Sequence, residues 1–287
     1  MILLVVLGLL LSVSYPAVDA FYSVWRADSA VSTVAAKRRD AVFLDSALRK
    51  AVEVLKRDDG AYDALSEFWA KPIVLETPVG ELSVQIVDLD RYLNLNLVGR
   101  NPLVTAAFER LLLLLEVDYE LLDRLLMWSG VRKPSGQPRT AFPVKGRPLD
   151  SVYELLYFWN ETADLYGGNK GGITYPGLLE LTTVHSDGKI NLNTAPYWIL
   201  RSLDDELDDA LARQIIEERE RSPFKSLQEV LRVPGVSADL LYRISKLVKF
   251  RSRYFKITLK LKRGEFQTVL EAVYDRATDK VLEKAIY

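Results

Sequence analysis

The chain has 287 residues, 49% of them apolar, and a formal net charge of −1 at pH 7. Its length and apolar content suffice for one large or two small globular domains, whereas the charge lacks the positive surplus of proteins built to bind nucleic acid. The absence of cysteine excludes disulfides, thiolate catalysis and cysteine-based zinc sites. The single histidine, His185, has no clustered partner in the sequence and is expected to be an ordinary loop residue.

Residues 1–20 form a nearly uncharged apolar run that is close to the length of a bilayer-spanning helix. From residue 21 to 57 there is no Gly or Pro, and apolar residues recur at intervals of three and four. We therefore predict one long helix that starts in a transmembrane segment at residues 1–20, is kinked at Pro16 and stops before Gly60.

Two further interpretations of this segment remain open at the sequence level. A secretory signal cleaved after Ala20 would release a soluble protein. The positive residues follow the apolar run instead of preceding it, and the positive-inside tendency by itself favours a cytoplasmic body. These positive residues are Arg26, Lys37, Arg38 and Arg39.

Alternating apolar and polar residues predict strands on both sides of a central region. The first strand or hairpin covers residues 73–90, and three more strands cover residues 254–262, 265–274 and 280–287. In the second group, Phe255, Ile257, Leu259 and Leu261 point to one face, as in a sheet with one buried side. The simplest α+β architecture packs this antiparallel sheet against the long helix.

The central region, residues 98–250, reads as helices joined by loops rich in Pro and Gly. The predicted helices cover residues 105–117, 119–130, 150–161, 196–203, 205–221 and 226–248. The predicted organisation is thus a transmembrane part (1–20), a helix with the first strands (21–97), an inserted helical domain (98–250) and the last strands (251–287).

Residues 212–244 resemble tandem helix-hairpin-helix modules, whose nucleic-acid-binding versions present backbone N–H groups to a phosphate from a Gly-apolar-Gly turn. Only Pro234-Gly235-Val236 remains of such a turn, and the other hairpin is acidic, so we predict a structural role. The competing hypothesis is a membrane-anchored DNA-binding protein. It would use Lys225, Arg232, Arg243, Lys246 and Lys249.

An Asn-Leu-Asn motif stands at each border of the central region, at residues 94–96 and 191–193. Asn side chains satisfy backbone groups at turns and cap helices, so we predict structural roles for Asn94, Asn96, Asn191 and Asn193. Asn193 or Thr194 is placed to cap a helix that begins at Pro196. The acids Asp88 and Asp90 are likewise expected to form a turn, because no proton-transfer partner accompanies them.

Together, the apolar start, GELSVQIVDLDRYLNLN (80–96), KINLNTAP (189–196) and SPFKSLQEVL (222–231) resemble the minor pseudopilin K family of bacterial type II secretion. The resemblance covers essentially the whole chain. It implies a type IV pilin-like fold, in which a long N-terminal helix packs on an antiparallel sheet. A large all-helical domain with helix-hairpin-helix-like (SAM-like) elements is then inserted between the strands.

The resemblance also implies a non-catalytic function at the tip of the pseudopilus, in support of protein export across the outer membrane. The implied partners are minor pseudopilins I and J, the H subunit, the major pseudopilin and the inner membrane, with no nucleic acid. The protein would cross the inner membrane once and hold its body in the periplasm. A short basic leader ending in Gly would be removed during processing.

Two residue-level expectations follow from the resemblance. Most pilin-like proteins carry at mature position five a Glu that pairs with the amino terminus of a neighbouring subunit, whereas Val5 stands here, as suits a tip subunit with nothing above it. Family members also bind calcium in the insert through an acidic segment, of which this chain keeps only one acid. The candidate ligands are Asp123 and, as substitutes, Asp150, Glu154, Asp164 and Asp187.

Overall fold

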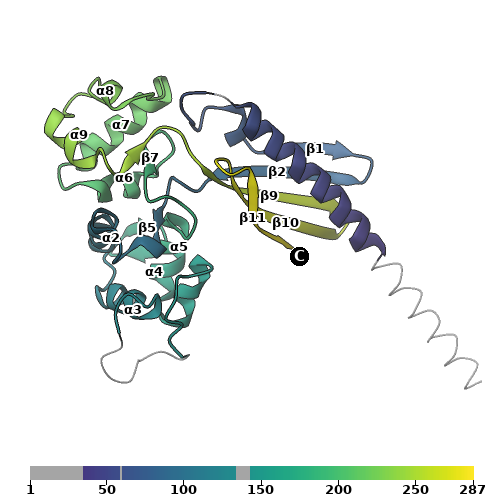
Figure 1. The fold of residues 1–287 in the computed structure, drawn as a ribbon, viewed down its shortest axis with the longest axis horizontal. Coiled ribbons are helices and arrows are strands. Elements are labelled where there is room, and N and C mark those ends of the chain that lie inside the picture. Colours follow the sequence, from purple (N-terminus) through teal and green to yellow (C-terminus); the bar gives the residue numbers. More distant parts are fainter. Residues whose placement is uncertain (1–34, 59, 134–142) are drawn as a thin grey trace, which may run out of the picture.

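The computed structural model describes residues 35–58, 60–133 and 143–287, which form two lobes (Figure 1). One lobe, here the sheet lobe, packs a long helix on an antiparallel sheet. The other, here the insert, comprises residues 93–249 and is mainly helical. No helix within the described residues is long and apolar enough to cross a membrane, and both the expected transmembrane segment and Val5 lie outside those residues.

The sheet has five antiparallel strands in the order β1-β2-β9-β10-β11, so the chain leaves it after β2 and returns in β9. The predicted strands are confirmed, because alternation is a reliable signal when one face of a sheet is buried. The bounds are β1 Ile73–Thr77, β2 Gly80–Asp88, β9 Tyr254–Arg263, β10 Phe266–Asp275 and β11 Lys280–Ile286.

The long helix covers residues 35–57 in the described part and crosses one face of this sheet (Figure 1). Its apolar residues at intervals of three and four are buried against the strands, as burial of an amphipathic face requires. These residues are Leu44, Leu48, Ala51 and Leu55. An ion pair between Asp40 and Arg263, at 2.6 Å, fixes the helix to the end of β9.

The insert contains most of the predicted helices, with shorter bounds. They are the 3-10 helices η2 Leu95–Leu97 and η3 Val152–Tyr157, and α2 Pro102–Leu114, α3 Glu120–Trp128, α4 Thr162–Tyr166, α5 Leu178–Leu181, α6 Tyr197–Leu203, α7 Asp209–Arg221, α8 Leu227–Val230 and α9 Ala238–Ile244. The sheet lobe holds a further 3-10 helix, η1 Phe68–Ala70.

The expectation of an all-helical insert is wrong, because three small two-stranded sheets lie within it. The antiparallel pair β4 Gly168–Lys170 and β5 Ile173–Tyr175 turns at Gly171 and Gly172, whose positive φ angles suit a hairpin. The parallel pairs have only two residues per strand, too few to show a sequence period. They join β3 Leu93–Asn94 to β6 Thr182–Thr183, and β7 Ile190–Asn191 to β8 Val248–Lys249.

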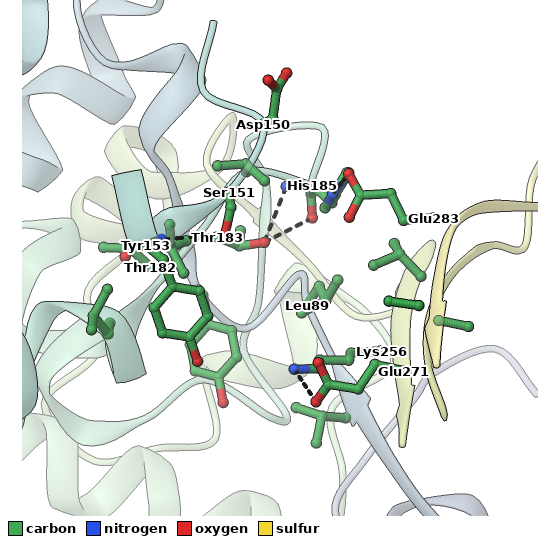
Figure 2. Close-up of a pocket in the computed structure, with 18 of the residues that line it drawn as sticks. Leu89, Asp150, Ser151, Tyr153, Thr182, Thr183, His185, Lys256, Glu271 and Glu283 are labelled. Carbon is green, nitrogen blue, oxygen red and sulfur yellow. Dashed lines mark hydrogen bonds and ion pairs between the residues drawn. The ribbon is translucent and has the colours of Figure 1, made fainter. Parts of the chain in front are cut away.

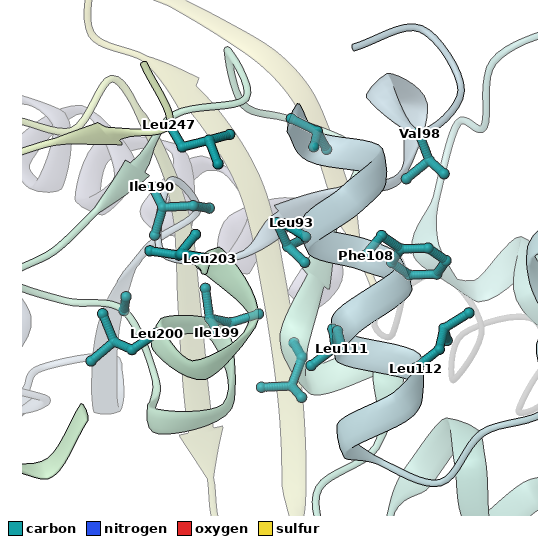
Figure 3. Close-up of a cluster of buried hydrophobic side chains, with 14 of the residues drawn as sticks. Leu93, Val98, Phe108, Leu111, Leu112, Ile190, Ile199, Leu200, Leu203 and Leu247 are labelled. Carbon is teal, nitrogen blue, oxygen red and sulfur yellow. The ribbon is translucent and has the colours of Figure 1, made fainter. Parts of the chain in front are cut away.

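A single hydrophobic core fills the insert (Figure 3). Helices α2 and α6 pack together over it, with Phe108 and Leu111 from α2 and Ile199 from α6 buried. Leu93 of β3 and Ile190 of β7 enter the same cluster. Both parallel strand pairs, β3–β6 and β7–β8, therefore contribute to the same core.

We predict that Leu44→Ala lowers the free energy of unfolding by about 3 kcal/mol, because it leaves a cavity between the helix and the sheet. The exposed fraction of Leu44 is 0%, whereas that of Val42 on the same helix is 66%. The matched variant Val42→Ala should change the stability by less than about 0.5 kcal/mol. Chemical denaturation followed by circular dichroism measures both, and equal costs would contradict the packing of this helix.

Candidate functional site

A buried group of polar side chains joins the two lobes at the end of β2. We call it the lobe junction; its members are Asp63, Asp88, Asn191, Thr194 and Ser252, all buried. Asp88 lies at its centre, where Oδ2 accepts hydrogen bonds from Ser252 Oγ at 2.6 Å, Thr194 Oγ1 at 2.6 Å and Asn191 Nδ2 at 3.3 Å. The donors come from the insert and from the segment that re-enters the sheet, so one carboxylate ties both to β2.

Asp63 extends the junction to the segment that follows the long helix. Its backbone N–H donates to Phe250 O at 2.8 Å, and its Oδ2 accepts from the Ser252 N–H at 2.5 Å. Its Oδ1 accepts from Arg276 at 3.0 Å, and its carbonyl accepts from Asn191 Nδ2 at 3.0 Å. Four parts of the chain that are distant in sequence therefore meet at this point.

The two acids of the Asp88-Leu89-Asp90 turn are structural groups with different partners. Burial raises the pKa of Asp88, and its hydrogen bonds, led by that from Ser252, oppose the rise. Asp90 Oδ2 lies 2.6 Å from Lys249 Nζ and accepts from the Arg253 N–H at 2.6 Å. Both carboxylates are enclosed and bonded within the protein, which suits them to hold the lobes together and not to transfer protons to a substrate.

A bidentate ion pair reinforces the junction where β9 begins. Arg253 Nε and NH2 donate to the two carboxylate oxygens of Asp275, each at 2.7 Å. Thr278 Oγ1 and the Ala277 N–H donate to the same carboxylate at 2.9 and 3.0 Å. These donors, Arg253 foremost, hold the pKa of Asp275 well below its usual range.

The two Asn-Leu-Asn motifs make the same pattern of hydrogen bonds. In each, the Oδ1 of the first Asn accepts from the N–H of the second, at 2.9 Å for Asn94 and 3.0 Å for Asn191. The second Asn pairs with both backbone groups of a distant residue: Asn96 with Leu149 at 2.7 and 2.9 Å, and Asn193 with Phe224 at 2.8 Å twice.

Each motif also begins in a two-residue parallel strand, whose second residue is the first Asn, and the middle Leu is buried in both cases. The first Asn of each motif donates to a remote carbonyl, Ser186 O at 2.8 Å from Asn94 and Asp63 O at 3.0 Å from Asn191. The insert is therefore built from two halves that begin in the same way, although sequence spacing alone did not indicate a repeat.

The predicted helix cap near Pro196 is wrong in its details. Pro196 is itself the residue before α6 and no side chain caps this helix, because Asn193 is engaged by Phe224 and Thr194 by Asp88. Asn101 and Ser237 cap α2 and α9 instead. Long-range partners outcompeted the local capping role.

The helix-hairpin-helix-like region does not present a free basic surface. At the turn between α8 and α9, Pro234 is exposed and Gly235 has a φ of 89°. Of the cations proposed for DNA binding, Arg232 pairs with Glu218 at 2.8 Å, Arg243 with Asp204 at 2.9 Å and Lys249 with Asp90 at 2.6 Å. The remaining two, Lys225 and Lys246, are exposed. Three of the five cations are thus committed to acids, which weakens a phosphate-binding interpretation.

The acids considered for calcium do not form one cluster, since only Asp150 and Glu154 lie together, and each acid faces a cation of the chain. Asp123 pairs with Arg132, and Asp187 with Lys249 at 3.0 Å. Asp150 and Glu154 both bind Lys145, at 2.9 and 2.5 Å, and Asp164 binds Lys170 at 2.8 Å. Calcium takes about six to eight oxygens, including several carboxylates, so the residues present do not fit a calcium site.

In the described part of the chain, one group of three carboxylates does lie close together, and the sequence reasoning missed it. Asp58, Asp63 and Glu67 approach one another within 4.8 Å beside the lobe junction. Arg276 pairs with two of its members, at 2.5 Å from Asp63 and 3.6 Å from Asp58. Burial and the neighbouring Asp63 raise the pKa of Asp58.

A cleft of about 680 Å³ lies between the outer face of the sheet and the insert (Figure 2). Its insert wall includes Ser151 and Thr183, and its sheet wall includes Lys256 and Glu271, which pair at 2.8 Å. His185 lies in the loop between β6 and β7, as predicted, and its Nε2 is 3.1 Å from Glu283 Oε1 of β11. The cleft therefore separates the two lobes, and the contact between His185 and Glu283 bridges it.

Comparisons with known proteins agree with the family resemblance that the sequence motifs indicate. Residues 190–248 match the family model described as "Type II secretion system (T2SS), protein K". Among solved structures, one chain of the crystal structure of the GspK-GspI-GspJ complex from the enterotoxigenic Escherichia coli type 2 secretion system has a similar fold. Its TM-score is 0.63 at 17% identity, over 87% of this chain and 96% of that chain. No curated protein matches in sequence. The resemblance to the protein K family is thus confirmed over residues 190–248, and the structural match supports the fold.

We predict that Asn193→Ala lowers the free energy of unfolding by about 2 to 3 kcal/mol, because it leaves the buried N–H and carbonyl of Phe224 without partners. The exposed Asn160 supplies the control, and Asn160→Ala should cost less than about 0.5 kcal/mol. Urea denaturation measures both. A neutral Asn193→Ala would show that this clamp does not hold the insert.

Asp275→Asn should lower the free energy of unfolding by about 2 kcal/mol at pH 7, because it removes the charge of a buried carboxylate that the partly exposed Arg253 binds. The folded-state pKa of Asp275 is depressed, so its stabilisation is present above the unfolded pKa near about 4 and is lost as the pH falls through the folded pKa. The cost should therefore shrink by about 1 kcal/mol from pH 7 to pH 3.

The matched control for this pH dependence is Asp239→Asn, which alters an exposed acid on α9. Its cost should stay small at both pH values. If the cost of Asp275→Asn were independent of pH or grew on acidification, the clamp between Arg253 and Asp275 would not be the ionised pair that the structure shows.

Proposed function

We propose that the chain is a non-catalytic minor pseudopilin of a type II secretion system, which joins minor pseudopilins I and J at the tip of the pseudopilus and supports protein export across the outer membrane. Two findings that agree with each other support this proposal. The segment with the second Asn-Leu-Asn motif matches the protein K family, and the whole two-lobed fold is shared with a chain from a GspK-GspI-GspJ complex.

The sheet lobe supports a pilin-like mode of assembly. The helix of residues 35–57 buries one face on the sheet and leaves the opposite face uncovered. On this open face Val42 is exposed, beside charged residues that include Arg38 and Arg49. An uncovered helix face of this kind can pack against the corresponding helices of neighbouring subunits, because burial of Val42 and pairing of the charged residues around it favour association.

The insert supports the placement at a tip. It projects to one side of the helix and sheet, away from the end at which the described part of the helix begins (Figure 1). The lobe junction fixes it to the sheet lobe through buried hydrogen bonds instead of a simple linker. A subunit that ends an assembly can carry such a bulky lobe, since no further subunit has to stack upon it.

The apolar run of residues 1–20 supports a membrane anchor. We infer that it crosses the inner membrane once and that both lobes lie in the periplasm, where the H subunit and the major pseudopilin complete the assembly. Val5 fits this position, because a subunit with no neighbour above needs no acid in the bilayer to pair with.

Co-expression of the full chain with the candidate I and J pseudopilins of the same cell tests the proposal. Purification through a tag on this chain should yield a stable ternary complex in detergent. Failure to associate, with the chain shown to be folded by circular dichroism, would contradict it. The same sample distinguishes the DNA-binding alternative, which requires salt-sensitive DNA binding.

We predict that Val42→Asp reduces the recovery of both partners by at least about tenfold, because it replaces the exposed apolar side chain of the proposed assembly face by a charge. The matched control is Tyr242→Asp on α9 of the insert, where the exposed fraction is 82%. This control should keep normal recovery. Equal loss from both variants would indicate that the helix face is not the assembly surface.

A further inference from the structure

Two lysines of the insert occupy positions that are lined by oxygen atoms. Lys170 ends β4, and its Nζ donates to Asp164 Oδ1 at 2.8 Å, Leu115 O at 3.0 Å and Glu116 O at 3.0 Å. A carboxylate and two backbone carbonyls are the kinds of oxygen that bind hard cations. The ammonium group thus stands where a metal ion would find its ligands.

The position of Lys170 favours a positive charge for two further reasons. Leu115 and Glu116 follow the last turn of α2, and the carboxyl end of a helix attracts cations. Asp164 is buried, and its other oxygen accepts from Trp159 Nε1 at 3.0 Å. A buried carboxylate needs a partner of opposite charge, and Lys170 provides it while tying the β4–β5 hairpin to α2.

Lys145 forms the second such position, between the segment after residue 142 and η3. Its Nζ lies 2.5 Å from Glu154 Oε1 and 2.9 Å from Asp150 Oδ2, and its side chain is largely buried. Glu154 also accepts from Trp128 Nε1 at 2.8 Å and from the Asp150 N–H at 2.6 Å. One ammonium group therefore gathers α3, η3 and the segment between them.

The titration of these acids agrees with the geometry. Burial raises the pKa of Glu154, but the hydrogen bonds from Lys145, Trp128 and the Asp150 N–H outweigh it and leave the pKa below its ordinary value. Hydrogen bonds from Arg147 and Lys145 lower the pKa of Asp150 to about 2. Both acids are ionised at neutral pH, and their charge is compensated within the chain.

We propose that Lys145 and Lys170 are built-in cations of the insert, whose ammonium groups hold its acidic segments together so that this lobe folds without calcium. The resemblance to the protein K family implies calcium in the insert, but the acids here have their oxygens committed to lysine and arginine. A calcium ion would have to displace an ammonium group from each position, and neither offers the several carboxylates that calcium prefers.

The first test compares the purified full chain in excess calcium and in the chelator EGTA. A ligand that binds the native state raises the Tm, so a calcium-dependent insert would unfold at lower temperature in EGTA. We expect the two Tm values to agree within about 1 °C. A fall of several degrees in EGTA would overturn the proposal, whatever the chain assembles with.

The second test replaces each lysine by an apolar residue of similar length. Lys145→Met and Lys170→Met should each lower the Tm by about 5 to 10 °C, because they leave buried acids unpaired. The control Lys246→Met changes an exposed lysine of the same lobe and should shift the Tm by less than about 1 °C. If both lysine variants behaved like this control, the lysines would not be structural cations.

Discussion

The structure depends on one constraint: the carboxyl group of Asp88 is buried at the point where the chain leaves the sheet, and a buried polar group must be hydrogen-bonded. Its donors, Ser252, Thr194 and Asn191, come from the end and the middle of the chain. The carboxylate can be satisfied only when the insert is folded and docked and β9 has returned beside β2. The folding of each lobe is therefore coupled to the attachment of the insert to the sheet lobe.

This coupling joins the two lobes rigidly, because the insert is attached to the sheet lobe at more than one point. The insert contains the same arrangement twice: a two-residue parallel strand that ends in the first Asn of an Asn-Leu-Asn motif, whose second Asn pairs with a distant backbone segment. The second copy also supplies Asn191 to the lobe junction. Such attachment keeps the projecting insert in a fixed direction relative to the long helix of the sheet lobe.

Much of the fold could be predicted from the sequence, because its signals are local. The strands alternate since one face of the sheet is buried, and the helix shows its three- and four-residue period since one face packs on that sheet. The two-residue strands could not be predicted, because two residues carry no period. The cap expected from Asn193 or Thr194 failed for a related reason: their true partners lie 31 and 106 residues away.

The candidate site was less predictable than the fold. The acids Asp88, Asp150 and Glu154 are visible in the sequence, but their counterions are not. The sequence alone allows a calcium site at these acids, whereas the structure places the ammonium group of Lys145 between Asp150 and Glu154. Likewise, basic residues near the α8–α9 turn suggested a phosphate surface until Arg232 and Arg243 were seen to pair with acids. Spacing indicates which groups are present, and only the fold decides which groups meet.

The central claim, that the chain assembles with other pseudopilins through its long helix, is tested most directly by site-specific cysteine crosslinking in cells. The chain has no native cysteine, so each introduced cysteine is the only one that can react. Val42→Cys on the open face of the helix should form crosslinks to the candidate I or J pseudopilin, identified by mass spectrometry, while Tyr242→Cys on the insert should not. Crosslinks to neither pseudopilin, or equal crosslinking from both positions, would contradict assembly through this helix.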